Sequence, residues 1–193
     1  MNTTYNFLEQ IISNRRTAKS ATMNGQLIDD NLVKQILALA NWAPTHGHTE
    51  PWRFIVYNNM TKKDFCNAHA AMYKQHTPQE SFVLATFEKL QQMSDKASHI
   101  VVVYNKRGDN AKIPPIEEIV ASSIAMQNIL LGAEALNIAV HLSTGGMMHK
   151  QPMKDYFNLT DEDTMLAILY LGYSDEQKAG KRLTSIESKV EWR

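Results

Sequence analysis

The apolar residues of this chain follow two spacings, one typical of helices and the other of buried strands. Helical spacing predicts helices at about 6–14, 30–43, 61–77, 82–93, 115–136 and 151–157. Unbroken apolar runs predict strands at about 52–57, 100–104, 139–142 and 165–171. Asn6 and Glu9 occupy capping-box positions, so the first helix is expected to begin there. This pattern predicts an α+β fold.

The predicted helix at 115–136 is apolar on almost all sides. Such a helix lies either at the centre of a fold or in a subunit interface. Asn137 readily adopts the left-handed conformation and is expected to end this helix. The chain from Tyr173 onward is polar and follows neither spacing. We therefore expect one domain over residues 1–193, in which residues 173–193 form an extended C-terminal arm.

A short polar crossing joins the second predicted helix to the first predicted strand. It reads Trp-Ala-Pro-Thr-His-Gly-His-Thr-Glu-Pro-Trp over residues 42–52. Pro44 and Pro51 keep the residue before each of them out of the helical region, so the crossing is rigid. His46 and His48 lie between two tryptophans, and such loops between regular elements often carry binding groups. The alternative is a stiff connector whose tryptophans only fill the core.

A basic segment follows the first predicted helix. Arg15, Arg16, Thr17 and Lys19 combine three cations and a hydroxyl, which suits a phosphate group. A solvated basic corner explains the same residues equally well. A second basic group lies in the arm and comprises Lys178, Lys181 and Arg182.

The turn Ser143-Thr144-Gly145-Gly146 follows the third predicted strand. Its glycines allow backbone N–H groups to approach a ligand closely. Taken alone, the pattern is equally typical of an ordinary turn.

Composition and motifs exclude several classes of function. Twenty basic and twenty acidic residues give a net charge of zero, which provides no field to attract nucleic acid or an anionic membrane. The single cysteine, Cys66, excludes an intrachain disulfide, is expected to be buried packing and favours a reducing, cytoplasmic location. The seven histidines lack the spacing of a zinc site, so no metal is expected. Glycine motifs for dinucleotides, for nucleoside triphosphates and for a serine-hydrolase elbow are all missing.

The basic segment and the crossing together resemble the nitroreductase family of FMN-dependent oxidoreductases. Family members are similar in having Arg-Arg-Ser-x-Arg near the N-terminus, then Ala-Pro-Ser-x-x-Asn-x-Gln-Pro-Trp before a hydrophobic strand. This chain has Arg-Arg-Thr-x-Lys, then Ala-Pro-Thr-x-x-His-x-Glu-Pro-Trp before Arg53-Phe-Ile-Val-Tyr57. The long apolar helix, the glycine turn and the basic arm fall in the family's order, so the resemblance covers nearly the whole chain.

The resemblance implies an intertwined α+β homodimer with a central, mostly antiparallel sheet flanked by helices and an FMN at each of two interface sites. It also implies that flavin N5 carries out the chemistry, so no catalytic side chain is assigned. The residues expected to contact FMN are the basic segment, the crossing (often from the partner subunit), the turn and the arm: Arg15, Arg16, Thr17, Lys19, Trp42, His46, His48, Leu142, Ser143, Thr144, Gly145, Lys181 and Arg182.

The activity implied is ping-pong transfer of electrons from NADH or NADPH to a nitroaromatic, quinone or enone acceptor. The crossing departs from the family pattern at two residues, because His48 replaces the usual Asn and Glu50 replaces the usual Gln. The carboxylate of Glu50 needs either a partner, for example Arg53, or exposure to solvent. These departures motivate an alternative, an FMN-binding or storage protein with little turnover. A non-flavin module that binds a phosphate-bearing ligand is a third possibility.

Overall fold

The fold is built on one four-stranded antiparallel sheet. A computed structural model describes residues 2–176 and 179–193, so Lys178 lies outside the described residues. The strands are β1 (Trp52–Tyr57), β2 (His99–Asn105), β3 (Ala139–Ser143) and β4 (Thr164–Gly172), in the order β1-β2-β4-β3. The two central strands, β2 and β4, are almost entirely buried, as their unbroken apolar runs predicted. The predicted α+β class is confirmed.

The helices lie where the apolar spacing predicted them. They are α1 (Thr3–Asn14), α2 (Asp30–Ala40), α3 (Asn59–His76), α4 (Leu84–Gln92), α5 (Pro115–Ala135) and α6 (Gln151–Tyr156), with short 3-10 turns η1 (Ser20–Thr22), η2 (His46–His48), η3 (Gln79–Ser81) and η4 (Glu187–Lys189). The predicted start of α1 was wrong, because the side chain of Asn2 accepts the Thr4 and Tyr5 N–H groups and caps the helix earlier. Asn137 has the expected left-handed conformation, with φ of 56°.

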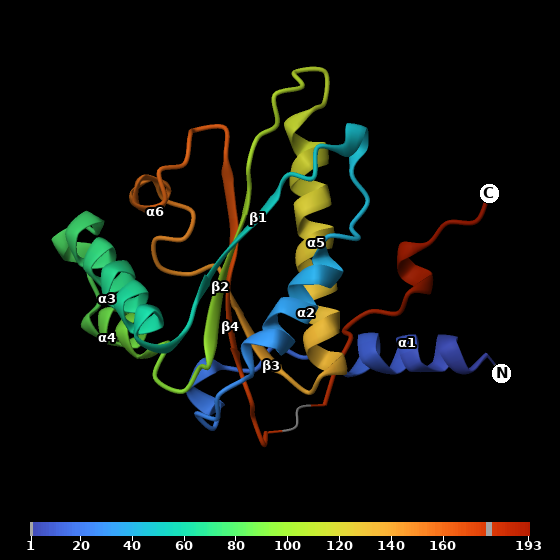
Figure 1. The fold of residues 1–193 in the computed structure, drawn as a ribbon, viewed down its shortest axis with the longest axis horizontal. Helices are drawn as coiled ribbons and strands as arrows, with labels where there is room; N and C mark the ends of the chain where they lie inside the picture. Colours follow the sequence, from blue (N-terminus) through green and yellow to red (C-terminus); the bar gives the residue numbers. More distant parts are fainter. Residues whose placement is uncertain (1, 177–178) are drawn as a thin grey trace.

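Helices cover both faces of the sheet (Figure 1). Helices α2 and α5 pack against each other and bury one cluster, which includes Ile36, Val103 and Ile129. Helices α3, α4 and α6 lie over the opposite face, where a second cluster is rich in methionine. Cys66 is fully buried in that second cluster, as expected for packing, and burial raises the pKa of its thiol.

A buried ion pair fixes the start of α5. Arg107 donates to Glu118, whose side chain is only 1% exposed, and also to the backbone oxygen of Ile113. The backbone N–H of Gly108 donates to the same carboxylate. The polar loop between β2 and α5 is therefore held close to the first turns of the helix.

Two segments make little contact with the rest of their own chain. Helix α1 has no buried residue, although Phe7, Leu8 and Ile12 form the apolar face that the spacing predicted. Residues 179–193 are all exposed, and in Figure 1 they run away from the sheet on the same side as α1. Both segments therefore leave apolar side chains uncovered.

Candidate functional site

The basic segment lies along the edge strand β3. The backbone N–H of Ala18 donates to the Val140 oxygen at 3.0 Å, and Thr17 forms a parallel bridge with Val140. One step further, the Ser20 N–H donates to His141 Nδ1 at 3.2 Å. Burial, together with the positive charges of Lys89 and Lys19, lowers the pKa of His141. The basic residues thus begin a strip that follows β3.

Arg16 lies at the start of this strip in a polar pocket. Its Nη1 donates to the backbone oxygens of Ser13 and Arg15, at 2.6 and 2.7 Å. Its Nε is buried and has no hydrogen-bond partner within the described residues. The pocket has a volume of about 580 Å³ and is lined by Asn14, Arg16, Thr17, Ala18, Glu134, Asn137, Ile138, Ala139, Ser174, Glu176, Ala179 and Gly180.

The C-terminal arm reaches the same pocket through its backbone. Gly180 lies so close to Arg16 that any side chain there would overlap the guanidinium group. The basic segment and the backbone of the arm, which are far apart in the sequence, therefore meet at Arg16. Lys181 and Arg182 follow directly and are exposed, and Arg182 contacts only the Lys181 backbone oxygen in the hydrogen bonds described.

The far end of the strip is the turn after β3. Leu142 and Ser143 end the strand half-buried, whereas Thr144 and Gly145 are exposed. The N–H groups of residues 144–146 make no hydrogen bond within the described chain. From Val140 to Thr144 the strip spans about 13 Å, at ~3.3 Å per residue. The turn therefore offers free donors at a fixed distance from Arg16.

His69 supports this turn through Met147, a role that sequence reasoning missed. Its Nε2 accepts the Met147 N–H at 2.9 Å, and burial lowers its pKa to about 4, so the ring is neutral at physiological pH. A Cβ on Gly146, which has φ of 66°, would lie 2.5 Å from that nitrogen. Only glycine fits between the turn and the ring.

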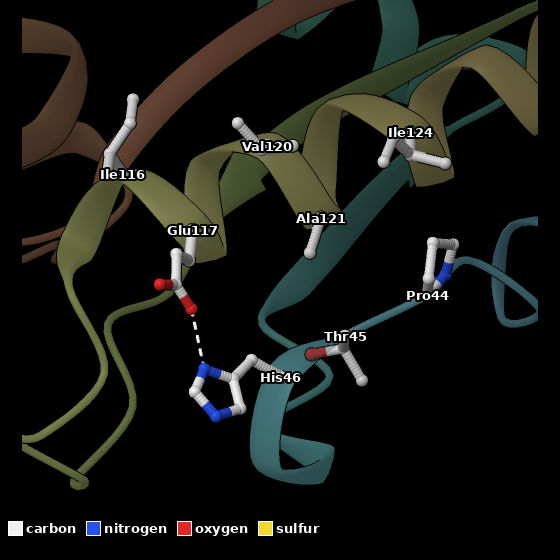
Figure 2. A pocket seen from close by; sticks show the side chains of 8 residues that line it. All are labelled: Pro44, Thr45, His46, Ile116, Glu117, Val120, Ala121 and Ile124. Atoms are coloured by element: carbon white, nitrogen blue, oxygen red, sulfur yellow. Dashed lines mark hydrogen bonds and ion pairs between the residues drawn. The ribbon is translucent and has the colours of Figure 1, made fainter.

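The crossing at residues 42–52 lies at the other end of α5. His46 Nδ1 is 2.6 Å from Glu117 Oε2 in the first turn of that helix (Figure 2). His48 is exposed and has a left-handed backbone, with φ of 54°. Arg53 donates to the backbone oxygen of Glu50 at 2.7 Å, and the Glu50 side chain is exposed.

The two tryptophans of the crossing differ. Trp52 is buried and donates through Nε1 to Asn41, as expected of core. Trp42 is 83% exposed and lines a separate groove with Lys34 and Arg53, away from the pocket that contains His46. Trp42 and His46 therefore do not share one pocket within a single chain.

Within one chain, the Arg16 pocket and the crossing with His46 lie far apart. Glu117, the partner of His46, begins α5, and Glu134, which lines the Arg16 pocket, ends it. At ~1.5 Å per residue the separation along the helix is about 25 Å. The segment that carries Arg15, Arg16, Thr17 and Lys19 thus lies alongside β3, while His46 and His48 do not join it.

The described residues contain neither a cluster of metal-ligating side chains nor a helix that could span a membrane. Among residues 2–176 and 179–193, no group of three or more His, Cys, Asp or Glu side chains could hold a metal ion. No helix in the same residues is long and apolar enough to cross a membrane.

Comparison with known proteins gives one consistent match. The sequence model of the nitroreductase family matches residues 12–173. YfhC of Bacillus subtilis strain 168, provisionally named an NAD(P)H nitroreductase, is 27% identical over 189 residues, which cover 96% of this chain and 93% of YfhC. A nitroreductase-like family protein from Bacillus cereus has a TM-score of 0.81 and 25% identity, over 96% of this chain and 95% of its own. The FMN-dependent nitroreductase NfnB from Mycobacterium smegmatis, solved with NADPH, has a TM-score of 0.74 at 13% identity, over 98% and 99% of the chains.

Proposed function

The chain belongs to the nitroreductase family, and from that premise we propose that it is an FMN-dependent enzyme that passes electrons from NADH or NADPH to a small organic acceptor. The acceptor is a nitroaromatic, a quinone or an enone, and the two half-reactions alternate at one site in a ping-pong sequence. One observation carries the proposal. Arg16 lines a polar pocket with a buried, unpartnered Nε–H, beside the strand that ends in three free backbone donors.

The residues around Arg16 fit the phosphate of FMN. A guanidinium group binds phosphate oxygens in pairs, and the Thr17 hydroxyl adds a short donor. Lys181 and Arg182 follow Gly180 directly in the sequence, are exposed, and would add positive charge if the arm folded over bound FMN. The strip of about 13 Å from Val140 to Thr144 suits the ribityl chain and the isoalloxazine edge. Bound FMN would supply reversible two-electron transfer, for which the protein provides orientation and charge.

The site becomes complete only when two copies of the chain associate. The Arg16 pocket and His46 lie about 25 Å apart along α5, further than one FMN extends. A second copy in a two-fold dimer brings its own His46 end to the Arg16 end of the first. The uncovered apolar residues of α1 and of the arm, such as Phe7, Leu183 and Trp192, provide the surface for that association. Each dimer then holds two identical FMN sites.

The first experiment is optical. Purified protein, or protein incubated with FMN and freed of excess, should be yellow, and NADH or NADPH without oxygen should bleach it. Adding a quinone or a nitroaromatic should restore the colour. Protein that is colourless after incubation with FMN and removal of the excess would refute the proposal.

A second candidate function rests on the crossing. His48 and Glu50 replace two amide residues and both have left-handed backbones, with φ of 54° and 42°. Such strain persists only where the surrounding structure requires it. If these residues prevent the reductant from docking, the protein stores FMN. That function predicts yellow protein whose colour NADH and NADPH leave unchanged.

A further inference from the structure

The loop between η1 and α2 contains the only Asn-Gly pair of the sequence, Asn24-Gly25. The loop lies beside the end of β4, where the Asn24 N–H donates to the Tyr173 oxygen at 2.9 Å (Figure 1). Both residues of the pair are exposed, and Gly25 has a left-handed backbone with φ of 82°. A Cβ built on Gly25 would meet no atom within 4 Å. Water therefore reaches the pair freely.

The Asn24 side chain is folded back onto the main chain. Its Oδ1 accepts the Gln26 N–H at 3.0 Å, which closes a ring around the Asn24–Gly25 peptide bond. A hydrogen bond to that oxygen withdraws electrons from Cγ and stabilises the oxyanion that an attack on Cγ produces. The Gly25 N–H and the amide nitrogen of Asn24 make no hydrogen bond within the described chain. The backbone nitrogen is therefore free to attack Cγ, and the amide nitrogen is free to leave it.

Asn158 has a similar conformation without these properties. It is exposed and left-handed, with φ of 53°, but Leu159 follows it in place of a glycine. The Leu159 N–H donates to the Lys154 oxygen at 2.9 Å. The nitrogen that follows Asn158 is therefore both bound and hindered by a side chain.

We propose that Asn24 is a site of spontaneous deamidation, in which the Gly25 backbone nitrogen displaces ammonia from the Asn24 side chain. The Gly25 amide gives its proton to water or hydroxide as its nitrogen bonds to Cγ. The bond from Cγ to the amide nitrogen then breaks, and the leaving group takes up a proton and departs as ammonia. Water opens the resulting cyclic imide to aspartate or isoaspartate. No electrons are transferred, and water is the only co-reactant.

The modification changes the point at which the arm leaves the sheet. There the Ser174 hydroxyl donates to the Thr22 oxygen at 3.2 Å, next to the contact between Asn24 and Tyr173. Deamidation adds a negative charge, and in isoaspartate the main chain runs through Cγ and becomes one carbon longer. The loop then holds the first residues of the arm less firmly.

The test is mass spectrometry of the full chain after incubation for successive periods, with digestion at mildly acidic pH, where the reaction is slow. The peptide with Asn24 should gain the mass difference between an amide and a carboxylic acid, and an isoaspartate-specific methyltransferase should label the product. The rate should rise about tenfold for each pH unit above neutral, because the attacking nitrogen must lose its proton. The peptide with Asn158 is the matched internal control and should stay unmodified.

Two variants test the pair itself. Gly25→Ala places a Cβ beside the attacking nitrogen and should slow the modification. Because alanine is strained at this left-handed position, Asn24→Gln provides a second variant, which leaves Gly25 in place and must close a larger, less favourable ring. It should also lose the modification. An Asn24 peptide modified no faster than the Asn158 peptide, or equally fast in Gly25→Ala and wild type, would overturn the inference.

Discussion

At the residue scale, Arg16 combines two properties. Backbone oxygens close to it in the sequence fix its guanidinium group, and one of its N–H donors has no hydrogen-bond partner. Two carbonyl oxygens hold Nη1, while the buried Nε–H has no partner in the described part of the chain. An unpaired buried donor costs free energy, and an anion in the pocket would remove that cost. The sequence predicted Arg16 from its neighbours in the motif. It could not predict the contact with Gly180, because that contact depends on the path of the arm.

Replacing Arg16 with Ala should weaken FMN binding by about 2–4 kcal/mol, the cost of leaving one side of a desolvated charge pair unpaired. Quenching of flavin fluorescence on titration measures the dissociation constant. Lys74→Ala removes the same charge from α3, on the opposite face of the sheet, and should leave the constant unchanged. An unaltered affinity in Arg16→Ala would show that the phosphate lies elsewhere.

His69 illustrates what single-residue inspection misses. In the sequence it is one of seven histidines. In the structure it accepts the Met147 N–H, 78 positions away, and is 1% exposed. Its role arises from the packing of α3 beneath the β3 turn, which local spacing does not encode.

His69 should make stability depend on pH. Burial lowers its folded pKa from 6.5 to about 4, so the unfolded chain takes up the proton first as pH falls. The stabilisation is complete above pH 6.5 and is lost progressively down to about pH 4, by on the order of 3 kcal/mol. Urea unfolding at several pH values, at one protein concentration, should show this loss for wild type and not for His69→Gln. Parallel pH curves for the two proteins would contradict the assignment.

At the scale of elements, the apolar spacing predicted the long helices well. It did not predict which polar side chains fix those helices in place. The 115–136 pattern predicted α5 to within a residue. The same pattern treats Glu117 and Glu118 alike, although Glu117 is exposed beside His46 and Glu118 is buried against Arg107. Burial of a charged residue follows from its partner, and Arg107 lies in a polar loop without periodicity.

These adjacent glutamates provide a matched pair of variants. Glu118→Gln leaves Arg107 buried without its counter-charge, and we expect a loss of about 3–5 kcal/mol in the free energy of unfolding. Glu117→Gln changes an exposed pair and should cost less than about 1 kcal/mol. Urea denaturation of both variants measures the difference. Similar losses in the two would mean that the buried pair contributes no more than the exposed one.

At the scale of the whole molecule, the sequence predicted an extended arm and an apolar face on the first helix without indicating what they contact. Helix α1 has an apolar face and no buried residue, and the arm exposes Leu183, Ile186 and Trp192. Hydrophobic spacing shows that a face needs cover and does not show whether the same chain covers it. We therefore propose that a second copy of the chain covers these faces.

Deleting residues 183–193 should convert the proposed dimer to a monomer and abolish FMN binding. The arm carries exposed apolar side chains, and in the proposed dimer these would contact the second copy beside the Arg16 pocket. Light scattering after size exclusion measures the mass. A matched change elsewhere, Val83→Ser with Leu84→Ser, alters two exposed apolar residues at the start of α4 and should leave the dimer intact. A truncated protein that remains dimeric would rule out this role for the arm.

The placement of the two half-sites at opposite ends of α5 has a genetic consequence. In the proposed dimer, a chain carrying Arg16→Ala and a chain carrying His46→Gln should each be defective when paired with themselves. Refolded together, the two chains should form mixed dimers. One FMN site of each mixed dimer then contains both substitutions, and the other site contains neither. Random mixing should then restore about a quarter of normal benzoquinone turnover, whereas half-sites drawn from a single chain would complement nothing.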